Sequence, residues 1–128
     1  MEHSTFLDAA ENGEFDVVRS MVEDGTAADS KDEHGRTALY KAAKHGHADI
    51  VNFLISSGAD VSARDNRGTT ALYWAAVNGH KEIIKTLIEN GASADVTDDR
   101  GWSIMDHIKS SGNQQLIEYL ESKSASMA

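Results

Sequence analysis

Histidine is the side chain of this protein that could hold a transition metal. The chain has six histidines and no cysteine, and its densest pair is His45 and His47, on either side of Gly46. A zinc site needs about four Cys, His or acidic ligands at close spacing. The remaining histidines are scattered along the chain without acids at ligand spacing. We therefore expect no metal ion and no other cofactor.

Adjacent carboxylates could act as a general acid and base. Such pairs occur at Asp32 with Glu33 and at Asp98 with Asp99, and the segment 95–101 is acidic enough to suggest calcium. Both pairs lie beside a glycine in a pattern typical of solvated turns, where carboxylates keep ordinary pKa values. The chain has no nucleophile elbow, zinc-protease helix, phosphate-binding loop or EF-hand pattern. We expect no catalytic residues and no enzymatic activity.

The composition of the chain indicates its cellular compartment and the kinds of partner that it can bind. The chain has 128 residues, a net charge of −9, 40% hydrophobic residues and no apolar run long enough to span a bilayer. Its first residues lack the basic and apolar segments of a secretory signal. The absence of cysteine gives no support for an oxidising compartment, so we expect a protein of the cytoplasm, with the nucleus as a second compartment, and without membrane contact. The negative charge opposes nonspecific binding of nucleic acid.

A block of residues recurs every 33 positions. The helices and turns that this block forms must position any functional site. An Asp stands three places before a Gly in three copies: Asp32 and Gly35, Asp65 and Gly68, Asp98 and Gly101. Further glycines share the period at positions 46, 79 and 112 and at positions 25, 58 and 91. A period of this length is typical of stacked repeats. We predict four repeats, at about 1–31, 32–64, 65–97 and 98–122, followed by a flexible tail, 123–128.

Each repeat is predicted to form a hairpin and two helices. The Asp-x-x-Gly segment favours a tight turn, and Thr37 then caps a short helix that carries Leu39 on its apolar face. Gly46 fits the left-handed position that ends this helix. A second helix with a buried stripe runs on to Gly58. Such thin units bury their apolar faces only by stacking on their neighbours.

The terminal repeats need polar outer surfaces. Ser20 stands where the second repeat has Phe53, and no hairpin precedes the first helix. In the last repeat, Asp106 and Glu121 replace the tyrosine and isoleucine of the middle repeats. These changes predict an N-terminal and a C-terminal cap, and hence a monomer.

The middle repeats read DEHGRTALYKAAKHGHADIVNFLISSGADVSA and DNRGTTALYWAAVNGHKEIIKTLIENGASADV. This pattern resembles the ankyrin repeat over about residues 4–122. The resemblance implies an all-α repeat solenoid of helix-turn-helix units with β-hairpin loops. It also implies a non-enzymatic protein-binding scaffold, and it makes His47 and His80 structural residues. Tyr40 and Tyr73 stand where the family usually has histidine, and no proline opens the first helix.

The family binds partners through its concave face, which consists of the hairpin tips and the first helix of each repeat. Reading this face off the period gives a basic strip with two tryptophans. Its predicted partner-binding residues are Lys31, His34, Arg36, Lys41, Lys44, His45, Arg64, Arg67, Trp74, Asn78, Arg100 and Trp102. Exposed Trp among basic residues is typical of a binding hot spot. The alternative is that hairpin tips are generally charged and that Trp102 merely shields the last repeat.

These observations predict a protein-protein interaction module that binds an acidic partner as an adaptor or inhibitor. The alternative function is binding of single-stranded RNA, with bases stacked on the two tryptophans.

Overall fold

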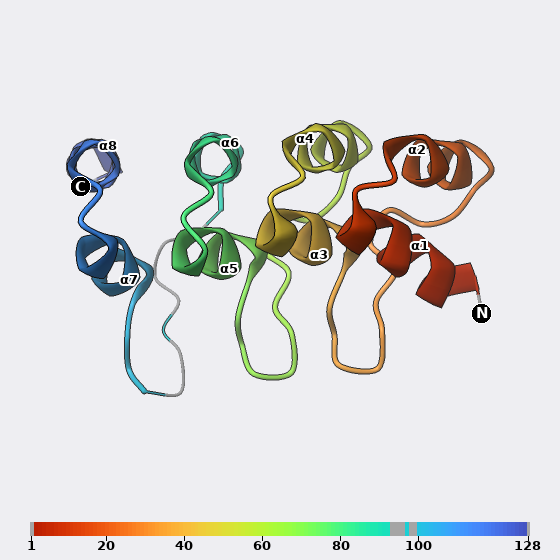
Figure 1. Ribbon diagram of the computed structural model, residues 1–128, viewed down its shortest axis with the longest axis horizontal. Coiled ribbons are helices and arrows are strands. Elements are labelled where there is room, and N and C mark those ends of the chain that lie inside the picture. The colour runs from red at the N-terminus through yellow and green to blue at the C-terminus, as the bar shows by residue number, and fades with distance from the viewer. Residues whose placement is uncertain (1, 93–96, 98–99, 128) are drawn as a thin grey trace.

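The fold is a row of helix pairs, described here from a computed structural model that covers residues 2–92, 97 and 100–127. The first helices of the pairs are α1 (Glu2–Asn12), α3 (Ala38–His45), α5 (Ala71–Val77) and α7 (Ile104–Ser111). The second helices are α2 (Phe15–Glu23), α4 (Ala48–Ser56), α6 (Lys81–Glu89) and α8 (Gln114–Met127). Figure 1 shows the first helices in one row and the second helices in another. The predicted all-α repeat solenoid is confirmed.

The loops that enter α3 and α5 project away from both rows of helices (Figure 1). In the first loop, Asp32 Oδ1 accepts hydrogen bonds from the backbone N–H groups of His34 and Arg36, each at 2.9 Å. A single β-bridge between Lys31 and Thr37 closes this loop as a hairpin. The Asp-x-x-Gly turn is therefore formed as the sequence predicted. The matching carboxylates Asp98 and Asp99, with most of the acidic segment 95–101, lie outside the described residues.

Hydroxyl side chains begin the first helices. Thr37 Oγ1 accepts from the Tyr40 backbone N–H at 3.2 Å, and Thr70 Oγ1 accepts from Tyr73 in the same way. Ser103 and Asp106 form a reciprocal capping box at the start of α7. The exposed Asp106 thus caps its own helix.

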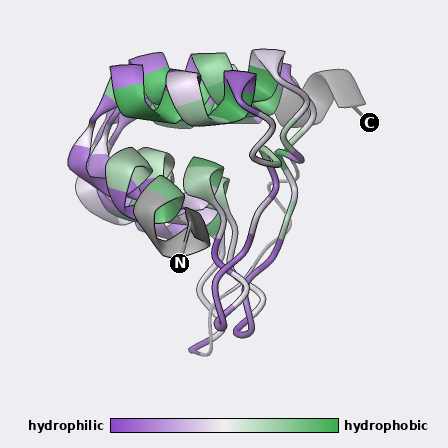
Figure 2. Ribbon diagram, turned by 90° about the vertical axis from the view of Figure 1, so that its right-hand side faces the viewer, coloured by the Kyte–Doolittle hydropathy of each residue, from purple (hydrophilic) through white to green (hydrophobic). Residues whose placement is uncertain are grey.

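The core lies between the two rows of helices. α3 packs against α1 and α5, while α4 packs against α2 and α6. Figure 2 shows the hydrophobic side of the second helices turned toward the first. Fully buried side chains include Phe6, Leu39, Ile50, Leu54, Leu72, Ile84, Leu87, Ile104, Ile108 and Leu116. The alanines of the first helices are also buried, which lets neighbouring repeats approach closely.

Two histidines tie consecutive repeats together. His47 Nε2 lies 2.8 Å from the Glu11 carbonyl oxygen, and His80 Nε2 lies 3.0 Å from that of Lys44. Each carbonyl belongs to the last turn of the preceding first helix, where it has no partner within the helix. These contacts give His47 and His80 the structural role that the resemblance implied.

Both outer ends of the array carry exposed polar side chains. Ser20 on α2 and Glu121 on α8 are exposed, as expected of caps. The last helix runs on to Met127, so the boundary expected at residue 122 falls inside α8. Among the described residues, no helix is both long enough and apolar enough to cross a bilayer.

Candidate partner-binding site

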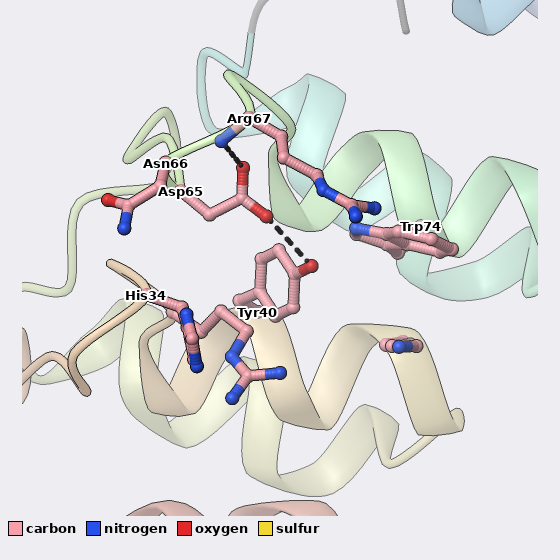
Figure 3. Close-up of a pocket in the computed structure, with 8 residues that line it drawn as sticks. His34, Tyr40, Asp65, Asn66, Arg67 and Trp74 are labelled. Carbon is pink, nitrogen blue, oxygen red and sulfur yellow. Dashed lines mark hydrogen bonds between the residues drawn. The ribbon is translucent and has the colours of Figure 1, made fainter. Parts of the chain in front are cut away.

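A pocket of about 370 Å³ lies where the hairpins of the second and third repeats meet α3 and α5. Figure 3 shows residues of both hairpins and both helices around it. Its lining consists of His34, Arg36, Tyr40, Lys44, Asp65, Asn66, Arg67 and Trp74. The pocket lies on the concave face and is the candidate site.

Asp65 is the centre of the hydrogen bonding in this pocket. Its Oδ1 accepts from the backbone N–H groups of Arg67 at 3.0 Å and Thr69 at 2.9 Å. Its Oδ2 accepts from the Thr69 hydroxyl at 2.7 Å and the Tyr40 hydroxyl at 3.0 Å. Burial alone would raise the pKa of Asp65, but these hydrogen bonds outweigh it and lower the pKa below its ordinary value. Asp65 is therefore an ionised, fully bonded structural group.

Asp32 occupies the equivalent place one repeat earlier. Burial again opposes ionisation, yet hydrogen bonds from Arg36 and His34 lower the pKa of Asp32. The sequence-based expectation of ordinary pKa values at these turns is wrong for Asp32. Its carboxylate is half-buried and is surrounded by donors of its own turn.

Tyr40 connects two repeats in place of the family's histidine. Its side chain is only 5% exposed, and the hydroxyl on α3 donates to Asp65 in the following hairpin (Figure 3). Burial raises the pKa of Tyr40 to about 12. The phenol therefore stays protonated at neutral pH and serves as the donor to the carboxylate.

Some basic residues of the strip are already neutralised within the protein. Lys41 Nζ lies 3.2 Å from Glu11 Oε1 on α1, and the Lys41 side chain is only 13% exposed. The hydrogen bond from Lys41 lowers the pKa of Glu11. His45 Nε2 lies 3.6 Å from the same carboxylate oxygen, while burial lowers the pKa of His45. Lys41 and His45 thus turn toward α1 and not toward the pocket.

Trp74 forms one wall of the pocket. Its ring lies edge-on to Tyr40 at 6.3 Å and to Tyr73 at 5.1 Å, and the Lys44 ammonium lies 4.4 Å from a ring centroid. The indole N–H donates to Thr69 Oγ1 at 3.1 Å. Trp74 is therefore half-buried and bonded. The expectation of an exposed tryptophan at this position is therefore corrected.

Aromatic contacts continue from Tyr73 toward the last repeat. His107 on α7 lies 5.2 Å from the Tyr73 ring and 5.1 Å from the Trp102 ring. The Arg100 guanidinium lies 5.4 Å from the Trp102 ring. Trp102 is 39% exposed, so a large part of its ring faces solvent. A series of edge-to-face and tilted rings thus runs along the concave face from α3 to the hairpin of the fourth repeat.

The structure brings some of the predicted residues together and separates others. The pocket contains five of them: His34, Arg36, Lys44, Arg67 and Trp74. Lys31 and Arg64 are exposed elsewhere on the hairpins, and Asn78 Nδ2 donates to the Lys44 carbonyl oxygen at 2.8 Å. Sequence reasoning left Tyr40 and Asp65 off this face, because both occupy scaffold positions of the repeat. The replacement of the usual histidine by Tyr40 was the available signal.

The described part of the chain contains no group of three histidine or acidic side chains placed to hold a metal ion. The Asp98 and Asp99 pair lies outside that part.

Comparison with known proteins agrees with this architecture. The family model for ankyrin repeats in three copies matches residues 3–65 and residues 62–127. A search of curated proteins gives no significant match. Ankyrin repeats are generally protein-protein interaction modules. With most of its length matched, the chain belongs to the ankyrin repeat family.

Proposed function

We propose that this protein is a non-enzymatic interaction module that binds an acidic segment or surface of another protein through its concave face. The observation that carries the proposal is the pocket between the second and third repeats. Three basic side chains from two hairpins and an inner helix, Arg36, Lys44 and Arg67, line it beside the ring of Trp74. Binding along this face would make the protein an adaptor, or an inhibitor that masks the bound segment.

The charge distribution supports an acidic partner. The chain has a net charge of −9, yet its exposed acids include Asp16, Asp49, Glu82, Glu89 and Glu118 on the second helices, away from the pocket. Opposite charge on a partner speeds association and orients it toward the basic strip. The same charges on the second helices repel an acidic partner from the other face.

Affinity capture from cell extract, followed by mass spectrometry, tests the proposal. Arg67→Ala is the primary variant, because the described residues include no ion-pair partner for this guanidinium and its removal leaves the scaffold intact. Asp49→Ala on the exposed side of α4 is the matched control. We expect Arg67→Ala to release partners that the control retains. Retention by the wild-type protein should also fall as salt is raised from about 0.05 to 0.5 M.

Partners retained equally by Arg67→Ala, and also by the Arg67→Ala, Trp74→Ala double variant, would place binding elsewhere. Because Trp74 is half-buried, its replacement can lower stability as well as affinity, so the melting temperature of the double variant must also be measured.

The competing function is binding of single-stranded RNA along the same strip. The 39% exposed ring of Trp102 favours it, since exposed aromatic rings stack on bases. The net charge of −9 opposes it through repulsion of phosphates. A gel shift with a short single-stranded RNA separates the two functions, and we expect no shift at about 0.15 M salt.

We place this interaction in the cytoplasm, with the nucleus as a second compartment. The absence of cysteine supports a reducing compartment, because nothing in the chain uses an oxidising one. Fluorescence microscopy of the tagged full chain tests this placement, and a signal confined to the secretory pathway would contradict it.

A further inference from the structure

We propose that the pocket between the second and third repeats binds a phosphorylated side chain of the partner protein, and that Arg67 makes the main contact with the phosphate. This inference rests on the proposed function and names the chemical group recognised at that site. The three bases Arg36, Lys44 and Arg67 line the pocket together with a single carboxylate, Asp65. The lining itself has two net positive charges, and the Asp32 carboxylate, which pairs with Arg36 from outside the lining, reduces the charge of the site to one. A phosphomonoester has three strong acceptor oxygens, which suit three basic side chains better than the two oxygens of one carboxylate do.

Asp65 does not compete for the basic groups. All four of its described hydrogen bonds come from Tyr40, Thr69 and the Arg67 backbone, and none comes from the side chain of a base. Its low pKa follows from these bonds. The guanidinium donors of Arg67 stay available for an incoming anion.

Two of the three bases are held in place before any ligand binds. Arg36 bonds Asp32 through Nε at 2.7 Å, and this bond leaves the two terminal nitrogens of the guanidinium to donate elsewhere. Asp32 does not line the pocket. Lys44 is held by its ammonium, 4.4 Å from the Trp74 ring. Such fixed side chains lose little conformational freedom on binding, which raises affinity.

Arg67 differs from the other two bases. Its backbone N–H is bonded to Asp65, but its guanidinium has no ion-pair partner among the described acids. In Figure 3 its side chain extends over the pocket toward Trp74. A planar guanidinium can bind a phosphate through two parallel hydrogen bonds, whereas Lys44 supplies a point charge beside it. The three bases thus offer more hydrogen-bond donors than the oxygens of one carboxylate can use.

Capped neutral heptapeptides, Gly-Ser-Gly-X-Gly-Ser-Gly, provide the probe. X is phosphoserine, phosphotyrosine, aspartate or serine, and binding is followed by nuclear magnetic resonance of the full chain labelled with ¹⁵N. The indole N–H signal of Trp74 reports on the pocket, and that of Trp102 is the internal control. We expect saturable shifts at Trp74 with a phosphopeptide, at an affinity at least about fivefold higher than with aspartate. The two phosphorylated peptides show whether a serine or a tyrosine phosphate fits better.

Arg67→Gln should weaken phosphopeptide binding about tenfold, the usual effect of losing hydrogen bonds to a charged group. Arg64→Gln is the matched control, because Arg64 is an exposed base of the same loop that does not line the pocket. Both variants should melt at the wild-type temperature, since neither guanidinium has an ion-pair partner among the described residues. Equal weakening by both variants would indicate nonspecific charge attraction and overturn the proposal.

Other outcomes also overturn it. These are equal affinity for the aspartate and phosphoserine peptides, or no saturable shift at Trp74. The proposed function can survive either outcome, and a further titration with an acidic peptide of eight glutamates decides this. If that peptide binds and shifts both tryptophan signals, the groove recognises acidic segments without a phosphate site. If no peptide binds, the proposal of an acidic partner is itself wrong.

Discussion

At the residue scale, one carboxylate joins two repeats. Asp65 is bound by donors of its own turn and by the Tyr40 hydroxyl from the preceding helix. A hydrogen bond to a charged, partly buried group is worth about 1.5 to 3 kcal/mol, more than one between neutral groups. The exchange of the family's histidine for tyrosine at position 40 therefore keeps the hairpin attached to the helix layer by a different bond.

Tyr40→Phe should lower the free energy of unfolding by about 1 to 2 kcal/mol, because it removes one donor from Asp65 and leaves the ring in place. Urea denaturation of Tyr40→Phe, Asp65→Asn and the double variant measures the coupling between the two side chains. A coupling energy near zero would show that the 3.0 Å contact does not stabilise the fold.

The Asp65 carboxylate also makes the stability of the fold depend on pH. Because the pKa of Asp65 in the folded protein lies below its ordinary value of 3.8, ionisation stabilises the fold above that value. This stabilisation is lost as the pH falls through the folded pKa. We expect Asp65→Asn to be less stable than the wild type at pH 7, with the difference shrinking below about pH 4. Thermal unfolding from pH 7 to pH 3 measures this, and a constant difference would contradict it.

At the element scale, the glycine that ends α3 lies close against a histidine of the following repeat. Gly46 ends α3 with φ +83°, and a Cβ built there would lie 2.8 Å from Cε1 of His80. Gly79 has φ +74°, and apart from its own chain neighbours no atom of the described residues lies within 4 Å of its Cβ position. The His80 ring that faces Gly46 has no counterpart at Gly79, because the equivalent position of the next repeat is Asn113.

Gly79→Ala should cost about 1 to 2 kcal/mol, from the left-handed conformation alone. Gly46→Ala should cost clearly more, because the methyl group also displaces the His80 ring from the Lys44 carbonyl oxygen. Chemical denaturation of the pair of variants measures the difference. Equal losses would mean that the ring moves aside without cost.

The start of the first helices offers a route to higher stability. Ala38 and Ala71 follow Thr37 and Thr70, whose ψ values of 171° and 172° suit a residue before proline. Proline at the first helical position restricts the unfolded chain, so Ala38→Pro and Ala71→Pro should each stabilise by about 0.4 to 1 kcal/mol. Both alanines are buried, so the ring has to fit between neighbours. Lower melting temperatures would show that it does not.

At the scale of the whole molecule, stability comes from contacts between neighbouring repeats. The inner first helices, α3 and α5, each pack on the first helix before them and on the one after them, and the terminal repeats expose the polar side chains Ser20 and Glu121. We predict a monomer, because exposed polar side chains such as Ser20 and Glu121 at the two ends disfavour the stacking of a second copy. Sedimentation equilibrium at about 10 to 100 µM checks this, and a mass that rises with concentration would contradict it.

Much of the fold could be read from the period. Asp32, Thr37 and Gly46 act through backbone groups within a few residues of themselves, so their turn, cap and helix end followed from local chemistry. The stacking of repeats followed from the buried stripe of each second helix. The same register placed His34, Arg36, Lys44, Arg67 and Trp74 on one face, and all five line the pocket.

By itself, the sequence determined the fold family, the alternation of hairpins and helices, and a basic face on an acidic chain. Only the tertiary structure decided which basic groups remain available. Lys41 turns to Glu11, thirty positions away, whereas the Arg67 side chain lines the pocket over Trp74. The structure also showed that Tyr40 bonds Asp65 across a repeat boundary. Ion pairs and hydrogen bonds depend on distances of a few ångströms, and these distances exist only once the repeats are stacked.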